Sequence, residues 1–112
     1  MKMDIVIKSL TQSKNTWEFL DGSSRSAESL RTSYVGLGAY KPGWRWSEHV
    51  GKQTGKQSEN HIGYVISGSF IVKSASGEEQ TVGTGEAFEL PPGSDAWVNG
   101  EETCVALVHR IA

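Results

Sequence analysis

The chain has 112 residues with a formal net charge of −2, of which 37% are hydrophobic and 21% charged. This length suits one domain and is short for two, and the composition is that of a globular protein rather than a disordered one. The 11 basic residues are scattered and no apolar run is long, so we expect neither nucleic acid nor a membrane as a partner.

The N-terminal segment MKMDIVIKSLTQSK interrupts its few apolar residues with charged ones. It therefore lacks the apolar core of a signal peptide, and we expect a cytoplasmic protein. Cys104 is the only cysteine, which excludes an internal disulfide and a cysteine-cluster zinc site. Because Cys104 lies in the alternating segment CVALVHR, a small buried residue is favoured over a reactive thiol.

Short apolar and β-branched runs separated by Gly, Pro and Ser turns predict strands along the whole chain. The predicted strands are Ile5–Ile7, Trp17–Leu20, Ser33–Tyr40, Trp44–Val50, His61–Ser67, Phe70–Ser74, Gln80–Val82, Ala87–Leu90, Ala96–Asn99 and Cys104–Arg110. Only Ser26–Arg31 has the composition of a short helix, and Gly51–Asn60, without an apolar residue, is expected to be a solvated loop. Many short strands with frequent turns indicate an all-β sandwich or barrel.

His61 opens an otherwise apolar predicted strand, and Gly63 follows two residues later. Residues two apart on a strand share a face, so the missing side chain of Gly63 leaves space beside the imidazole. We expect His61 to point into the barrel and Gly63 to leave a cavity next to it. Tyr64 lies on the opposite face and is expected to pack away from this pocket.

The spacing of glycines, histidines and prolines resembles the two motifs of the cupins, small RmlC-like jelly-roll barrels. Five residues separate Gly43 from His49, and six separate His61 from Gly68, as in the first cupin motif. The segment GEAFELPPG, Gly85–Gly93, matches the second motif.

This resemblance covers about residues 40–110 and implies an all-β fold, a single cupin-type jelly-roll β-barrel over residues 1–112. Residues 40–110 would form the barrel core, and residues 1–39 would add N-terminal strands and a connecting loop.

In cupins the two motifs usually hold one divalent metal ion through three histidines and one glutamate. Here His49 takes a histidine position and His61 the glutamate position, whereas Gly51 and Ala96 replace the other two histidines. The resemblance implies a degenerate site in which His49 and His61 bind Zn, Fe, Ni or Mn, ions that imidazole suits. Candidate third ligands are Glu48, Gln57, Glu59 and Asp95. The alternative is that both histidines are ordinary polar residues in a partly wet pocket.

Regular alternation in the segment WRWSEHV places His49 on one face and both Trp44 and Trp46 on the other. If His49 faces inward, the indoles face outward and need a cover, unless a β-bulge breaks the alternation. The reverse arrangement buries both indoles and leaves His49 solvated. From the surplus of aromatic residues opposite the histidines, we expect a homodimer through a face that includes Trp44, Trp46 or Tyr64.

Ala96 and Trp97 are the remaining candidate pocket residues, after the double-proline turn. If Ala96 faces inward, Trp97 faces outward; if Asp95 and Trp97 face inward, they line the mouth of the pocket. Both orientations are compatible with the sequence.

Three functions are compatible with these features, because the cupin fold serves many activities. The first is binding of a small polar molecule in the barrel interior, through a degenerate divalent-metal site and without a defined reaction. The second is a metal-dependent enzyme of the dioxygenase or isomerase type. The third is a metal-free, non-catalytic binding or interaction module. The sequence does not decide whether the protein is an enzyme.

Overall fold

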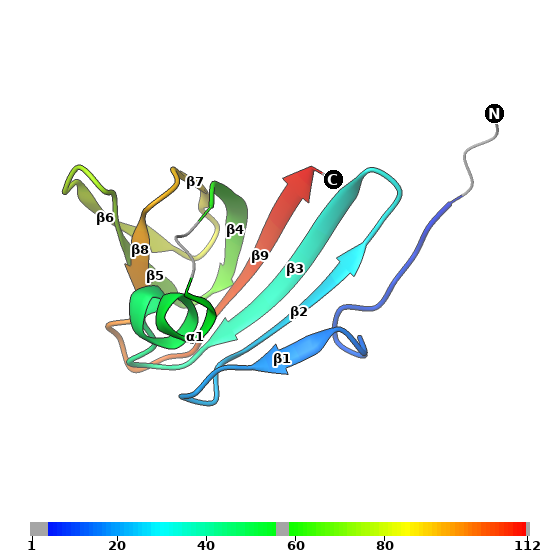
Figure 1. Cartoon of the computed structure of the whole chain (residues 1–112), viewed down its shortest axis with the longest axis horizontal. Coiled ribbons are helices and arrows are strands. Elements are labelled where there is room, and N and C mark those ends of the chain that lie inside the picture. The colour runs from blue at the N-terminus through cyan, green and yellow to red at the C-terminus, as the bar shows by residue number, and fades with distance from the viewer. Residues whose placement is uncertain (1–4, 56–58, 112) are drawn as a thin grey trace.

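The computed structural model describes residues 5–55 and 59–111, and most of its regular elements are β-strands (Figure 1). The strands are β1 Thr16–Glu18, β2 Ser24–Ser29, β3 Ser33–Tyr40, β4 His61–Ser67, β5 Ser69–Lys73, β6 Glu79–Gly83, β7 Ala87–Leu90, β8 Asp95–Trp97 and β9 Cys104–Ile111. Between β3 and β4 lie a π-helical segment, Ser47–Gly51, and the short helix α1, Lys52–Thr54. Neither described helix has the length and apolar character needed to cross a lipid bilayer.

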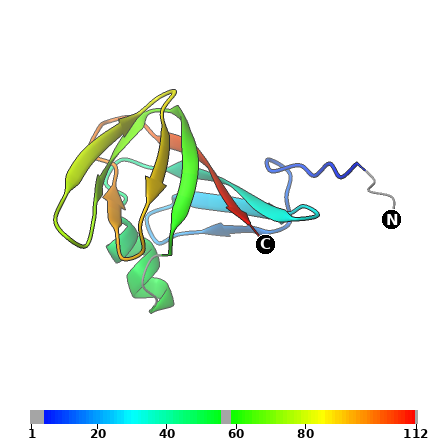
Figure 2. The same cartoon turned by 90° about the horizontal axis from the view of Figure 1, so that it is seen from above.

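The strands form two antiparallel sheets, one of six strands in the order β1-β2-β3-β9-β4-β7 and one of three in the order β6-β5-β8. Figure 2 shows that β2, β3 and β9 extend past the smaller sheet towards the N-terminal segment. Part of the inner face of the larger sheet is therefore left uncovered by the second sheet. The all-β jelly-roll prediction is confirmed, although strand pairing in the described residues does not close the two sheets into one continuous barrel.

The core lies between the two sheets and is built from residues that alternate with exposed ones along each strand. It consists of Phe19, Tyr40, Trp44, Val65, Phe70, Val82, Ala96, Val98, Cys104 and Ala106. Cys104 is fully buried, and burial raises the pKa of its thiol to about 11. The prediction that Cys104 is a small buried residue is therefore confirmed.

The predicted strand Trp44–Val50 is wrong beyond Arg45, which forms an isolated bridge to Trp97 before the chain turns into the π-helical segment. Asp95 causes this turn, because its carboxylate accepts hydrogen bonds from the Ser47 backbone N–H (3.0 Å) and hydroxyl (2.8 Å). Trp44 is only 3% exposed. It therefore lies in the core, as expected for the arrangement in which the indoles face inward.

The predicted helix over Ser26–Arg31 is also wrong, since Ser24–Ser29 forms β2 between β1 and β3. Ser26 is buried there and donates its hydroxyl to the Leu10 carbonyl oxygen, 2.6 Å away. Pairing on both sides satisfies the backbone of this polar segment, which outweighs its weak helical propensity. Ile5–Ile7 forms no strand, and its two isoleucines are 88% and 87% exposed.

The close packing over Gly63 gives a stability prediction. A Cβ atom at this position would lie 2.5 Å from Phe88 Cζ and closer still to the Leu107 carbonyl oxygen. Gly63→Ala should therefore lower the free energy of unfolding by about 1–3 kcal/mol, the usual cost of overpacking. Gly100→Ala is the control, because nothing lies within 4 Å of its added Cβ. Equal urea midpoints for the two variants would show that the space over Gly63 is not filled.

Candidate functional site

A small cavity of about 50 Å³ lies between the inner faces of the two sheets. Apolar and aromatic side chains dominate its walls, among them Trp44, Trp46, Phe70, Phe88, Leu90 and Ala96. Each water molecule occupies about 30 Å³, so this deep cavity has room for one or two waters or a group of that size. The buried Trp44 Nε1–H has no hydrogen-bond partner among the described residues.

A wider pocket of about 350 Å³, here called the vestibule, lies on the part of the larger sheet that the smaller sheet leaves uncovered. Its walls include Trp17 from β1, Ala27 from β2 and Tyr34 from β3. Arg25 and His61 line both the vestibule and the deep cavity. Val108 lines both spaces as well, and the polar boundary that Arg25 and His61 form between them is here called the neck.

Arg25 is half-buried on the inner face of β2, directly opposite Gly38 of β3. Its Nε and Nη2 atoms donate to the Tyr40 hydroxyl over 3.2 and 2.7 Å. The Tyr40 ring lies back over Gly38, where any Cβ would clash with the phenol. Because the bare glycine lets the ring lie flat, the hydroxyl reaches across to Arg25 and fixes the guanidinium at the neck.

No carboxylate among the described residues lies within ion-pair distance of Arg25. The acid in the vestibule wall, Glu59, pairs with Arg110 at 2.6 Å. Glu28 belongs to the same strand as Arg25, but it alternates to the other face and bonds Ser13 and Asn15. The guanidinium of Arg25 therefore presents an uncompensated positive charge to the neck.

His61 is the first residue of β4, and its half-buried side chain lines the neck together with Arg25. Burial lowers its pKa, and the positive charges of Arg25 and Arg110 act in the same direction. A hydrogen bond to the Glu59 backbone and the Glu59 carboxylate oppose the shift without cancelling it. The imidazole is therefore neutral at pH 7, with one ring nitrogen left as a hydrogen-bond acceptor.

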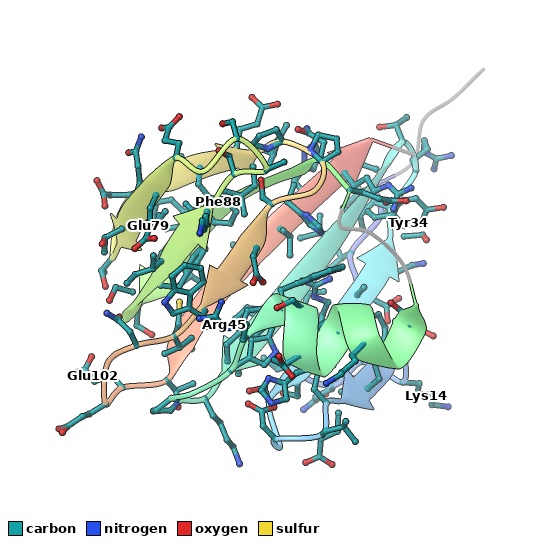
Figure 3. All side chains as sticks on the ribbon, turned by 60° about the vertical axis from the view of Figure 1, so that its left-hand side comes forward. Lys14, Tyr34, Arg45, Glu79, Phe88 and Glu102 are labelled. Carbon is teal, nitrogen blue, oxygen red and sulfur yellow. The ribbon has the colours of Figure 1, made fainter. Side chains whose placement is uncertain are left out.

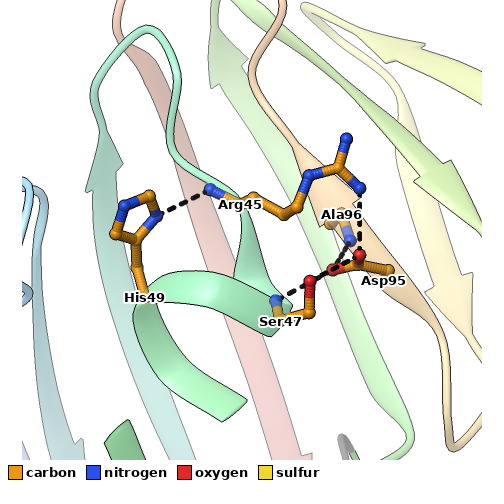
Figure 4. Close-up of polar contacts among 5 residues, drawn as sticks. All are labelled: Arg45, Ser47, His49, Asp95 and Ala96. Atoms are coloured by element: carbon orange, nitrogen blue, oxygen red, sulfur yellow. Dashed lines mark hydrogen bonds and ion pairs between the residues drawn. The ribbon is translucent and has the colours of Figure 1, made fainter. Parts of the chain in front are cut away.

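His49 lies elsewhere, in the π-helical segment, where its Nδ1 accepts a hydrogen bond from the Arg45 backbone N–H (3.0 Å). Figure 4 shows His49 and Asp95 on opposite sides of Arg45. The Asp95 carboxylate is engaged by Ser47 and by Arg45 Nη1, 3.2 Å away. His49 lines neither the deep cavity nor the vestibule, so the structure does not gather the two histidines around one described pocket.

The other predicted pocket residues are divided between the two faces of the sheets. Ala96 is buried and lines the deep cavity, whereas Trp97 lies outside it, under the Arg45 guanidinium at 4.2 Å. The Phe88 ring fills the space over Gly63, so the cavity borders on Phe88 rather than on the glycine. Gln57 lies outside the described residues.

The described side chains do not fit the metal centre that the cupin motifs imply. Ala96 and Gly51 offer no ligand atom, and the Trp46 ring lies 2.6 Å from where a Cβ of residue 51 would be. No three His, Cys, Asp or Glu side chains converge within residues 5–55 and 59–111. The assignment of His49 and His61 as ligands stays a prediction for metal-binding measurements.

Sequence reasoning missed Arg25 and Tyr40, the two residues that shape the neck. Arg25 precedes the segment that was predicted to be helical, although the alternation of Ser24, Arg25 and Ser26 was a possible strand signal. Tyr40 was correctly placed at the end of a strand, but nothing local indicates that its ring lies over Gly38.

No family model and no curated protein sequence matches the chain. Solved structures match it as folds. A sugar phosphate isomerase of the cupin superfamily from Silicibacter pomeroyi has a TM-score of 0.68 at 15% identity, covering 95% of this chain and 76% of that one. KdgF from a Halomonas species has a TM-score of 0.63 at 18% identity, and the match covers 87% of this chain and 86% of that one. The cupin domain of Schizosaccharomyces pombe Cnp3 has a TM-score of 0.62 at 13% identity, and the match covers 97% of this chain and 71% of that one. The chain therefore has the cupin fold, and identities this low carry no activity with it.

The lowered pKa of His61 predicts how stability depends on pH. The unfolded chain takes up a proton near the ordinary histidine pKa of about 6.5, before the folded protein does. The contribution of His61 to the free energy of unfolding is therefore fully present above that pH. It falls as the pH is lowered through that value towards the pKa of folded His61. His61→Gln should weaken this fall in urea unfolding between about pH 7 and 5, and the exposed His109→Gln should keep it. An unchanged pH dependence in His61→Gln would contradict the assignment.

Proposed function

We propose that this cupin-fold protein binds a small organic molecule in the vestibule, with one end of the ligand at the neck formed by Arg25 and His61. The observation that carries the proposal is the guanidinium of Arg25, which Tyr40 holds and no described acid neutralises, at the boundary of the two spaces. A volume of about 350 Å³ lies within the range of small-molecule sites, which are mostly apolar with a few placed polar groups. The walls fit a partly apolar ligand better than a fully polar one.

Binding needs no resident metal in this proposal. Arg25 supplies the charge, and the neutral His61 supplies an acceptor. The proposal thus combines two of the functions that the sequence allowed, namely binding of a small molecule and a binding module without a metal.

A second candidate is an isomerase-type enzyme in which His61 acts as general base. A neutral imidazole with a free acceptor nitrogen at the neck favours it, and so does the fold shared with the Silicibacter pomeroyi isomerase. Glu59, the carboxylate nearest to this histidine in the vestibule wall, is held by Arg110. The acid–base pair of an isomerase is therefore incomplete among the described side chains, which makes binding the stronger proposal.

Filling the vestibule should abolish binding. Ala27 is half-buried on the vestibule wall, so Ala27→Phe places a ring in the space without entering the core. Ala75→Phe is the matched control, because Ala75 is exposed in the turn between β5 and β6. In ligand-observed NMR with a library of small organic fragments, binders of the wild type should be retained by Ala75→Phe and lost with Ala27→Phe. Fragments that bind Ala27→Phe equally well would place their site elsewhere.

We also propose that the chain forms a homodimer through the outer face of β4. Ile62, Tyr64 and Ile66 are 44%, 45% and 43% exposed there, although an antiparallel sheet normally turns polar residues to water. Exposed apolar patches of this kind mark interfaces. Trp44 lies in the core, so of the aromatic residues expected at the interface, Tyr64 is the one that this face presents.

Charge on the outer face of β4 should weaken the dimer. Tyr64→Lys should shift the sedimentation equilibrium towards monomer, because a dimer would bury the new charge without a partner. Thr81→Lys, an exposed position on the smaller sheet, should leave it unchanged. A wild-type protein that sediments as a monomer at high micromolar concentration would contradict the proposal.

A further inference from the structure

We infer that the ligand is a small planar carboxylic acid, whose carboxylate pairs with Arg25 and whose apolar ring lies in the vestibule against Trp17 and Tyr34. This inference rests on the proposed binding function and specifies its ligand class. Four features of the site support it.

The first feature is the free end of the Arg25 guanidinium. Tyr40 takes the edge formed by Nε and Nη2. Within the described part of the chain, Nη1 has no hydrogen-bond partner and no acid pairs with the side chain. The end formed by Nη1 and the second N–H of Nη2 therefore offers two parallel donors, the fork that binds a carboxylate with two hydrogen bonds.

The second feature is the balance of charge around the neck. Arg25, Arg110 and Glu59 are the charged side chains that line the neck and the vestibule, and the histidines there are His61 and the exposed His109. Arg110 and Glu59 neutralise each other at 2.6 Å, and His61 is neutral. One positive charge is left over, and a half-buried charge without a partner is costly. A ligand with one negative charge removes that cost.

The third feature is the size of the two spaces. The deep cavity of about 50 Å³ is too small for a ring, whereas the vestibule of about 350 Å³ accommodates one. Arg25 lines both spaces. A ligand with its acid group at Arg25 must therefore place its body in the vestibule.

The fourth feature is a pair of exposed aromatic side chains in the vestibule. Trp17 lies directly opposite Arg25 in the pairing of β1 with β2, and it is 46% exposed. Tyr34 is 43% exposed near the start of β3, well away from Phe88 in the deep cavity (Figure 3). Exposed rings beside a pocket gain most by packing against a flat apolar surface. They favour an aromatic or similarly planar acid over a flexible one.

The experiment compares benzoate with benzamide, its neutral analogue of the same shape, by isothermal titration calorimetry. Benzoate should bind the wild type at least about tenfold more tightly than benzamide, as expected for a charge-assisted pair. Arg25→Gln should remove this preference and leave benzamide binding within about twofold of the wild type. Arg31→Gln, an exposed residue between β2 and β3, should keep the preference.

Arg25→Lys is the second variant, because it keeps the charge but loses the fork, and it should retain only part of the preference. A circular dichroism spectrum and a thermal midpoint equal to those of the wild type establish that each variant keeps the fold.

Benzamide binding as tightly as benzoate would overturn the carboxylate inference and leave the binding function standing. A benzoate preference that survives Arg25→Gln would overturn the role of Arg25. Failure of both probes at millimolar concentration would overturn the inference, and the fragment screen with Ala27→Phe then tests the binding function separately.

Discussion

The hydrogen bonds from Arg25 to the Tyr40 hydroxyl determine the shape of the site. They depend on Gly38, because only a residue without a side chain lets the Tyr40 ring lie back across β3. The same ring packs against Trp44 with 4.3 Å between centroids. Tyr40 thus connects the core to the guanidinium of Arg25.

Aromatic side chains cover two glycines of the interior. The Trp46 ring covers Gly51, and Phe88 covers Gly63 while meeting Phe70 edge-on at 5.2 Å. At Gly51, where the cupin motif has a histidine, the indole takes the space that a side chain would need. Arg25 and His61 are the polar side chains that line both the deep cavity and the vestibule, and we propose that a ligand binds there.

The sequence predicted the fold well, because the turns and the two-residue alternation are local signals. The burial of Val65 between exposed neighbours follows from that alternation, whereas alternation left the orientation of Ala96 open and the structure places it inward. The turn at Ser47 was not predictable in this way, since it depends on Asp95, a residue 48 positions further along the chain. The packing of Phe88 over Gly63 and the pairing of β2 on both sides are also long-range contacts, which is why the cavity wall and Arg25 were missed.

The central claim is that Arg25 binds the acid group of a ligand at the neck. The most direct measurement follows the ¹⁵Nε–H signals of arginine side chains by NMR while 4-methylbenzoate is added. The account predicts a saturable shift of the Arg25 signal together with the ring signals of His61. The Arg45 signal should not shift, because the Arg45 side chain is paired with Asp95. A saturable shift confined to Arg45, or an unmoved Arg25 signal in the presence of bound ligand, would contradict it.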